Sequence, residues 1–474
     1  MKKRFLITTV LAILIIAAKA EIKLPSIFTS NMVMQQESQP AIWGWTDSKS
    51  NVKVTTSWNN KTYEIKADQD GKWKQKVETI QYGGPYEMTI SDGSSIVLLK
   101  NILLGEVWLC GGQSNMEMPM KGFTGQPVKG SNMDILKAKN PNIRLITVPR
   151  NSTLQTVDDF EGKWEEASPS TVAEFSAAGY YFGRLVNELI DVPIGLISVN
   201  YGGSCVQAWM SRKTAVPFGE TGLPQSDADI KVKNRTPTTL FNGMLNPVIG
   251  YGIRGALWYQ GETNYEEADK YVELFPKMVT EWRELWQVGE FPFYYCQIAP
   301  FDYAVFHPAD WKEKYNSAYL REAQLKCTDI IPNTGMAVLM DCAHPTSIHP
   351  SEKDKAGERL ALLALAKTYG LSGFASESPT FKAMEIVGST ATISFNNVPN
   401  GITGFDEEIT TFEIAAANKV FYPATVWLRN KSVVVSSPKV KEPVAVRYAF
   451  KDAVKGQLFS TEGLPVSSFR TDDW

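Results

Sequence analysis

A serine that follows a short apolar run and two glycines is the first candidate for chemistry in this sequence. Val107 to Cys110 is followed by Gly111-Gly112-Gln113-Ser114-Asn115-Met116. The glycines allow a tight turn, and a serine where a helix begins can turn its own backbone N–H towards a developing oxyanion. A serine at this position can also simply cap the helix. Ser114 is therefore either a helix cap or the nucleophile of an acyl-transfer enzyme.

Two of the three histidines stand in a single loop after another apolar run. Residues 336–340 are followed by Asp341-Cys342-Ala343-His344-Pro345-Thr346-Ser347-Ile348-His349-Pro350. One histidine alone is usually structural, but a pair beyond a buried strand favours a role in catalysis. Imidazole titrates near neutral pH and can take the proton that makes a serine hydroxyl nucleophilic. Serine and histidine together thus predict acyl transfer.

Candidate donors for the oxyanion of such a reaction follow two more apolar runs. Gly202-Gly203 comes after residues 194–199 and offers backbone N–H groups without side chains in the way. Gln260-Gly261-Glu262-Thr263-Asn264 comes after residues 255–259, and the side-chain amide of Gln260 or of Asn264 could donate to an oxyanion. Taken alone, each segment is more typical of an ordinary turn.

The four loops follow compact apolar runs that alternate with longer helical stretches. The apolar runs are 107–110, 143–148, 194–199, 255–259, 291–298 and 336–340, and the helical stretches are 173–189, 267–286, 312–326 and 351–369. This alternation predicts an α/β fold with a central parallel sheet that is buried on both faces. Ligands bind beyond the carboxyl ends of such strands, which is where all four loops begin.

Short β-like segments separated by turn signals flank the α/β region on both sides. They include residues 41–45, 52–58, 62–65 and 86–90 before it, and 390–395, 411–415, 424–428, 432–435 and 444–448 after it. We therefore expect an N-terminal β-sandwich domain over residues 21–104, a catalytic domain over 105–372 and a C-terminal β-rich domain over 373–474.

The first twenty residues predict export. A basic segment at residues 2–4 is followed by an apolar run at 5–17 and by the small-x-small cleavage site Ala18-Lys19-Ala20. The apolar run is shorter than the roughly 20 residues that cross a bilayer, and no cysteine lies near the cleavage site for lipid attachment. We expect a signal peptide over residues 1–20 and a secreted or periplasmic protein without a membrane anchor.

Composition limits the remaining partners. Of 474 residues, 43% are hydrophobic and 21% charged, with a net charge of −3, which fits a packed protein and argues against nucleic acid or an anionic membrane as main partner. Five scattered cysteines, three histidines and no C-x-x-C pair argue against a disulfide framework and a structural zinc site. We therefore expect no metal and no cofactor, and the oligomeric state stays open.

The segments around these candidates resemble the sialate O-acetylesterase family of the SGNH hydrolase superfamily. The likeness is carried by residues 105–118 with G-Q-S-N-M, by Trp258-Tyr259-Gln260-Gly261-Glu262-Thr263-Asn264, and by Ile348-His349-Pro350 followed by Lys353. Ser, Gly, amide and His in this chain order is the block order of that superfamily. The G-x-S-x-G elbow of the other large class of α/β esterases is absent around Ser114. Further blocks extend the likeness over nearly all of the chain after residue 20.

This resemblance implies an α/β/α hydrolase core and roles for the residues that match its motifs. Ser114 would be the nucleophile and His349 the general base. The N–H groups of Ser114 and Gly203 would form the oxyanion hole together with the amide of Gln260, or otherwise Asn264. The substrate would be an acetylated carbohydrate.

The third member of the triad is where the sequence departs from the family. A D-x-x-H motif would place an aspartate at position 346, where Thr346 stands, while a literal D-x-x-H occurs at Asp341–His344. Either His344 is the base, or His349 is the base with a displaced or missing carboxylate. The fit of Ile348-His349-Pro350 favours His349, with Asp341 as candidate partner of its imidazole.

Sugar contacts and the nature of the substrate are less constrained. Trp209, Tyr259 and Glu262 are candidate substrate-binding residues, although aromatic side chains in such blocks commonly pack in the core. One alternative function is an acetyl xylan esterase acting on plant polysaccharide. Another is a catalytically inactive carbohydrate-binding protein, which ester turnover would exclude.

Overall fold

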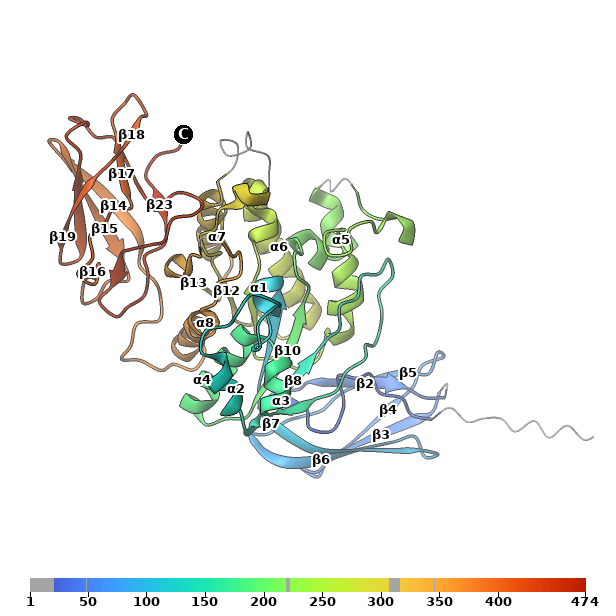
Figure 1. Cartoon of the computed structure of the whole chain (residues 1–474). Helices are drawn as coiled ribbons and strands as arrows, with labels where there is room; N and C mark the ends of the chain where they lie inside the picture. The colour runs from blue at the N-terminus through green and yellow to red at the C-terminus, as the bar shows by residue number, and fades with distance from the viewer. Residues whose placement is uncertain (1–20, 48, 219–221, 307–315, 345) are drawn as a thin grey trace, which may run out of the picture.

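One long strand, β7 (Ile96–Gly112), runs through two parts of the fold (Figure 1). The structure is a computed structural model that describes residues 21–474 except 48, 219–221, 307–315 and 345, so the expected signal peptide lies outside the described residues. The first half of β7 pairs with β6 (Gly83–Ser91), and the second half pairs with β10 (Ile194–Asn200) and β11 (Gly255–Tyr259). The domain boundary expected after Leu104 thus falls inside an unbroken strand.

The second half of β7 stands in the middle of a parallel sheet. The strand order is β13-β12-β11-β7-β10-β8-β9, in which only β9 (Glu165–Ala167) is antiparallel to its neighbour. Every residue of β10 and β11 is buried, as a sheet covered on both faces requires. The other parallel strands are β8 (Asn140–Thr147), β12 (Phe293–Cys296) and β13 (Thr334–Ala337). The predicted α/β class and parallel sheet are confirmed.

Helices cover both faces of this sheet (Figure 1). Val107 and Leu109 of β7 belong to one hydrophobic cluster, with α6 (Ala268–Trp286) and α7 (Ala318–Ile330). The alternate residues Trp108 and Cys110 belong to a second cluster, with α4 (Ala177–Ile190) and α8 (Lys353–Lys367). The short helices are α1 (Ser114–Glu117), α2 (Ser131–Leu136), α3 (Pro169–Glu174) and α5 (Arg212–Ala215).

The N-terminal region consists of β-strands on two sheets that share a core. The two-stranded sheet of β2 (Ala41–Trp45) and β5 (Lys72–Lys76) lies over the sheet that continues into β7. Ile42 from the first sheet and Val54 from the second belong to the same buried cluster. The remaining strands are β1 (Val33–Gln35), β3 (Asn51–Thr56) and β4 (Thr62–Lys66).

The C-terminal region is also built from β-strands and packs beside α7 and α8 (Figure 1). One sheet has the order β14-β15-β20-β19, a second β18-β17-β21-β23, and β16 pairs with β22. The bounds are β14 (Thr380–Val387), β15 (Thr390–Asn396), β16 (Ile402–Thr403), β17 (Phe412–Ala415), β18 (Phe421–Pro423), β19 (Thr425–Arg429), β20 (Ser432–Ser436), β21 (Ala445–Tyr448), β22 (Phe459–Ser460) and β23 (Phe469–Arg470). Arg321 of α7, fully buried, donates to Ser468 Oγ and to the Lys451 carbonyl and so connects this region to α7.

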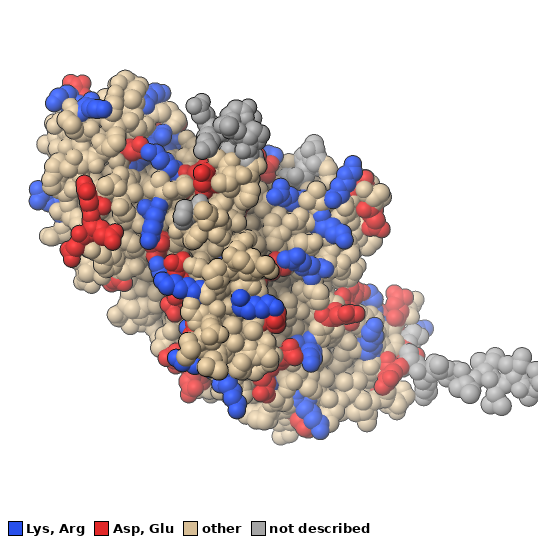
Figure 2. Space-filling view, in the orientation of Figure 1, with Lys and Arg blue, Asp and Glu red and all other residues tan. Residues whose placement is uncertain are grey.

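The distribution of surface charge, the state of the cysteines and the character of the helices show no specialised feature among the described residues. On the face in Figure 2, acidic and basic side chains are intermixed. All five cysteines are buried free thiols, so none forms a disulfide. Among the residues that the structure describes, none of the helices combines the length and apolar character needed to span a bilayer.

Candidate active site

Ser114 lies where β7 ends at the carboxyl edge of the sheet. Gly112, the last residue of β7, has φ +147°, and a Cβ there would lie 2.3 Å from the Tyr259 carbonyl oxygen of the adjacent strand. Only glycine fits this approach, so the chain can leave the strand and begin α1 at Ser114. The backbone N–H of Gln113 donates to the same carbonyl and fixes the turn.

The structure brings His349 to Ser114. The Ser114 Oγ lies 2.8 Å from His349 Nε2. On the other side of the ring, His349 Nδ1 is hydrogen-bonded to the side-chain oxygen of Gln126. An amide oxygen can only accept, so the proton of the neutral imidazole is on Nδ1 and the Nε2 lone pair faces the serine hydroxyl. This is the arrangement that a general base needs.

A tight turn holds Gln126 against the imidazole. Phe123 and Gln126 exchange backbone hydrogen bonds of 3.0 and 2.9 Å, and Gly125 between them has φ +73°. The Phe123 ring packs edge-on against the His349 ring with 5.4 Å between centroids. Turn and imidazole therefore fit together as one packed unit.

The position of His349 lowers the pKa of its imidazole to about 4, because the ring is largely buried and the positive charge of Lys353 is nearby. Burial also lowers the pKa of Lys353, to about 8. Gln126 carries no negative charge that would favour the imidazolium. The imidazole is consequently neutral around pH 7, the state that can accept a proton.

A buried polar network links the serine to the histidine loop. The Asn115 amide donates to Glu262 Oε1 and, over 3.1 Å, to the Ile348 carbonyl, while Lys353 Nζ donates to Asn115 Oδ1. Asn115, Glu262 and Lys353 are at most 4% exposed. Since Asn115 follows Ser114 and Ile348 precedes His349, this network sets the positions of the Ser114 and His349 side chains relative to each other.

The Gly202–Gly203 loop is clamped beside Ser114. The Gly202 N–H donates to Glu117 Oε2 over 2.8 Å, and the Gly202 carbonyl accepts from Asn234 Nδ2 over 2.6 Å. Arg150 makes a bidentate ion pair with Glu117. Because a trans peptide directs its C=O and the next N–H to opposite sides, the Gly203 N–H points away from Asn234. Neither this N–H nor that of Ser114 donates to an acceptor among the described residues.

These groups line one cavity of about 650 Å³. Its lining includes Gln113, Ser114, Gly202, Gly203, Arg235, Glu262, Thr263, Tyr265, Glu266, Tyr303, Phe306, Ile348 and His349. A serine hydroxyl, a neutral imidazole and two backbone N–H groups without protein acceptors thus face a shared space, which is what ester hydrolysis through an acyl-enzyme requires.

The sequence-based role of Asp341 requires correction. Its carboxylate makes a bidentate pair with Arg359, at 2.7 and 2.8 Å, and accepts from Lys355, and these cations hold its pKa well below the usual range. It does not contact His349, whose Nδ1 faces Gln126. His344, the alternative base, is exposed, and its Nδ1 faces the Thr346 backbone N–H. Asp341 anchors α8 to the loop.

The predicted side-chain amide of the oxyanion hole was also wrong. Gln260 Nε2 donates to the Ser204 carbonyl and to Asn264 Oδ1, and Gln260 is fully buried. Asn264 Nδ2 donates to Gln207 Oε1 over 3.0 Å. The amide N–H groups of both side chains already donate to other protein groups, so they are not available to an oxyanion. Neither residue belongs to the cavity lining.

Of the three predicted substrate-binding residues, only Glu262 lines the cavity. Burial raises the pKa of the Glu262 carboxyl, and its Oε2 is buried without a hydrogen-bond partner among the described residues. Trp209 is fully buried, packs on Trp258 and donates to Ser204 Oγ. Tyr259 is fully buried under Lys353. The two aromatic side chains are therefore core residues, because both stand on or against a central strand.

Sequence reasoning missed several residues that shape the site. Asn115 and Lys353 stand in the segments that resemble the family, so their positions close to Ser114 and His349 are a signal that the sequence offers. Glu117 also follows the serine closely. Gln126 and Asn234 stand in segments without a motif, and no feature of the sequence marks them.

Comparison with known proteins gives consistent results. The chain is 26% identical to the sialate O-acetylesterase of Mus musculus over 455 residues, which cover 82% of this chain and 81% of the relative. It is 28% identical to the sialate O-acetylesterase of Homo sapiens over 398 residues, covering 76% and 74%. A solved carbohydrate acetylesterase from Xanthomonas citri superposes with a TM-score of 0.86 at 32% identity, covering 96% of this chain and 100% of that chain.

The family resemblance read from the sequence is confirmed. Residues 104–366, which include the whole parallel sheet and both loops that carry Ser114 and His349, match the family described as carbohydrate esterase, sialic acid-specific acetylesterase. The chain therefore belongs to the sialic acid-specific acetylesterase family of carbohydrate esterases.

Proposed function

We propose that this chain hydrolyses O-acetyl esters of carbohydrates, most specifically of sialic acids, with Ser114 as nucleophile and His349 as general base. The observation that carries the proposal is the 2.8 Å contact between Ser114 Oγ and His349 Nε2 at the cavity wall. Family membership supports the esterase activity and the carbohydrate substrate. Acetate release from O-acetylated mucin, acetylated xylan and acetylated pectin tests the substrate class.

The geometry of the site supports the following reaction. Ser114 Oγ attacks the acetyl carbonyl carbon while its proton passes to His349 Nε2, and the oxyanion accepts from the N–H groups of Ser114 and Gly203. The C–O bond to the sugar breaks, and the imidazolium returns the proton to the leaving sugar oxygen. Water, deprotonated by His349, then attacks the acetyl-enzyme and releases acetate and free serine.

The clamp on the Gly202 peptide gives Asn234 a positioning role. We expect Asn234→Asp, which removes the donor to the Gly202 carbonyl, to lower kcat on 4-nitrophenyl acetate about 10- to 100-fold with KM nearly unchanged, since oxyanion contacts act in the transition state. Lys233→Ala, an exposed neighbour, is the matched control. Equal loss in both variants, or a change in KM alone, would contradict this role.

Arg235 supports an anionic sugar as substrate. It is exposed, lines the cavity, and has no side-chain partner among the described residues. A guanidinium matches a carboxylate in bidentate geometry, and a charge-assisted contact contributes about 1.5–3 kcal/mol.

Arg235→Gln should therefore lower kcat/KM for an O-acetylated sialic acid about 10- to 100-fold and leave 4-nitrophenyl acetate within about 2-fold. Arg235→Lys should fall between, because it keeps the charge and loses the fork. If Arg235→Gln lowers kcat/KM equally for the O-acetylated sialic acid and for 4-nitrophenyl acetate, Arg235 gives no support for a sialic acid as substrate. Preference of the unmodified enzyme for acetylated xylan, insensitive to Arg235, would favour the plant polysaccharide instead.

The lowered pKa of His349 predicts activity in mildly acidic solution. The neutral imidazole is the active form, so kcat/KM stays constant as pH falls from 7 to about 5 and is halved near pH 4, the pKa of this group. A pH profile on 4-nitrophenyl acetate measures this. An acid limb centred near 6.5 would show that the imidazole has an ordinary pKa.

Export and domain organisation complete the proposal. The signal-peptide pattern of residues 1–20 supports secretion or periplasmic location, and the β regions before and after the sheet support three domains with boundaries near residues 104 and 372.

A further inference from the structure

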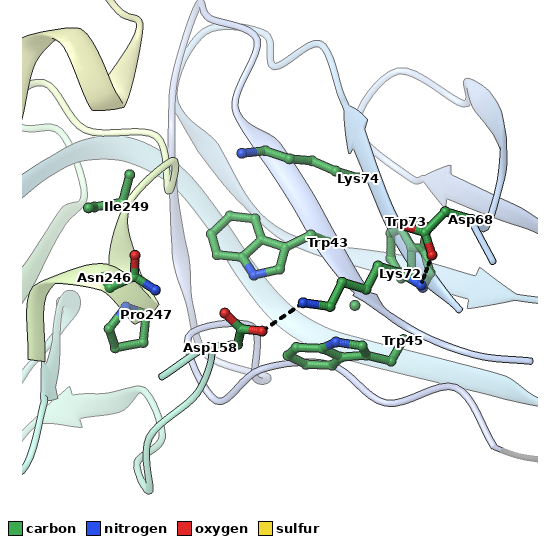
Figure 3. Close-up of a pocket in the computed structure, with 11 residues that line it drawn as sticks. Trp43, Trp45, Asp68, Lys72, Trp73, Lys74, Asp158, Asn246, Pro247 and Ile249 are labelled. Carbon is green, nitrogen blue, oxygen red and sulfur yellow. Dashed lines mark hydrogen bonds and ion pairs between the residues drawn. The ribbon is translucent and has the colours of Figure 1, made fainter. Parts of the chain in front are cut away.

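A second cavity lies between the N-terminal β region and the α/β region. It has a volume of about 360 Å³ and shares no lining residue with the cavity at Ser114. One wall is the outer face of β2 and β5, and the other is formed by Asp158 and by the 3₁₀ helix η5 (Asn246–Val248) with Ile249 (Figure 3). We call it the tryptophan cleft, after Trp43 and Trp45.

Register places both tryptophans on the outer face of the two-stranded sheet. Trp43 pairs with Lys74 and Trp45 with Lys72, whereas Gly44 between them pairs with Trp73, which is 4% exposed in the core. Side chains alternate along a strand, so Trp43 and Trp45 point away from the core of the sandwich. Both indoles remain partly exposed. Trp43 packs edge-on against the buried Phe28, with 4.6 Å between ring centroids, so core packing accounts for part of its surface. The exposed part of each indole remains available to a ligand.

Polar groups stand between the two indoles. In Figure 3 the Lys72 side chain extends between Trp43 and Trp45 towards Asp158, and its Nζ lies 3.0 Å from the carboxylate. The two side chains are 55% and 52% exposed, so each keeps hydrogen-bonding capacity for other groups. An exposed ion pair of this kind contributes little to stability and can rearrange around a ligand.

Aromatic faces beside exposed donors and acceptors are the chemistry that recognises a sugar ring. The C–H face of a pyranose can stack on an indole, while an ammonium and a carboxylate bind its hydroxyl groups. The cleft volume falls within the roughly 300–1,000 Å³ typical of small-ligand sites.

We propose that the tryptophan cleft is a carbohydrate-binding site, separate from the catalytic cavity, that takes a pyranose unit of a glycan between Trp43, Trp45 and the Lys72–Asp158 pair. The choice of a sugar over other small ligands rests on the carbohydrate esterase family of the chain, and not on Ser114 as nucleophile. A glycan that reaches both cavities is held at two points, which raises its apparent affinity, whereas a small ester gains nothing.

Binding is tested on the full chain carrying Ser114→Ala, so that no ester turnover is needed. Isothermal titration with xylohexaose, cellohexaose and 3′-sialyllactose should show saturable binding of at least one probe, with Kd in the range of about 0.1–10 mM. In the same background, Trp43→Ala and Trp45→Ala should each weaken that binding about 10-fold or more. Trp427→Ala, which removes a 45% exposed tryptophan of β19 outside both cavities, should leave it unchanged.

With Ser114 restored, Trp43→Ala and Trp45→Ala should hydrolyse 4-nitrophenyl acetate at the wild-type rate, which also shows that they are folded. Absence of saturable binding by all three probes overturns the proposal, and so does unchanged binding after both tryptophan replacements. Failure of the proposed function would appear differently, as absent ester turnover by the unmodified enzyme, and would leave the binding result intact.

Discussion

Ser114→Ala and His349→Ala should each lower kcat/KM on 4-nitrophenyl acetate by at least about 10³-fold. In the proposed mechanism the serine hydroxyl supplies the attacking oxygen and the imidazole 2.8 Å away takes its proton, so either loss disables the same step. For this reason the double variant should be no slower than the more damaged single variant. Initial rates for the three proteins, with circular dichroism to check folding, provide the measurement.

His344→Ala is the matched control, because it removes a histidine from the same loop. His344 is exposed, and among the described residues its imidazole is hydrogen-bonded to Thr346, so its replacement should leave kcat/KM within about 2-fold. An inactive His344→Ala beside an active His349→Ala would assign the base to the D-x-x-H motif. Retention of a substantial rate by Ser114→Ala would exclude Ser114 as the nucleophile and leave the inactive carbohydrate-binding protein or another chemistry.

Replacement of Gln126 should separate orientation of the imidazole from its charge. Gln126→Ala removes the acceptor that fixes the Nδ1–H tautomer, and we expect kcat/KM to fall about 10- to 10³-fold. Gln126→Glu keeps the acceptor and adds a negative charge that favours the imidazolium. It should raise the pKa of His349 from about 4 by about 1–3 units and move the acid limb of kcat/KM to higher pH by the same amount.

Thr124→Glu provides the control for the added charge. Thr124 lies in the same turn but is exposed, so a carboxylate there is screened by solvent and should shift the acid limb very little. Complete pH profiles of kcat/KM for Gln126→Ala, Gln126→Glu and Thr124→Glu give both quantities. If Gln126→Glu leaves the acid limb where it is, the acid limb does not report the titration of His349 beside this side chain.

The sequence by itself determined the parallel sheet and the loops that follow its strands, although β13 ends at Ala337 and not at the predicted Met340. Apolar runs of four to eight residues separated by helical stretches predict parallel strands covered on both faces, and β7, β10, β11 and β12 lie where these runs stand. Since parallel strands share a carboxyl edge, the loops carrying Ser114, Gly203 and His349 had to meet there.

Only the tertiary structure decided which polar side chains lie against Ser114 and His349. Gln126 is 223 residues from His349, and nothing in its turn marks it as the partner of an imidazole. Asp341 stands in the same loop as His349, but its carboxylate forms ion pairs with two cationic side chains of α8. Gln260 and Asn264 follow β11 at the carboxyl edge, but their side chains are hydrogen-bonded to each other and to Ser204 and Gln207.

The physical reason is that secondary structure and burial depend on residues close together in the sequence, whereas hydrogen-bond partners of buried side chains come from residues far apart in the sequence. The alternation of apolar residues along the chain decides whether a segment becomes a strand and whether it is buried, so Trp209 and Tyr259 could be placed near the sheet from sequence. A buried donor or acceptor must find a partner wherever the packed elements provide one, because leaving it unpaired costs about 1–3 kcal/mol. That choice is made between residues far apart in the chain, and here it gave His349 an amide in place of a carboxylate.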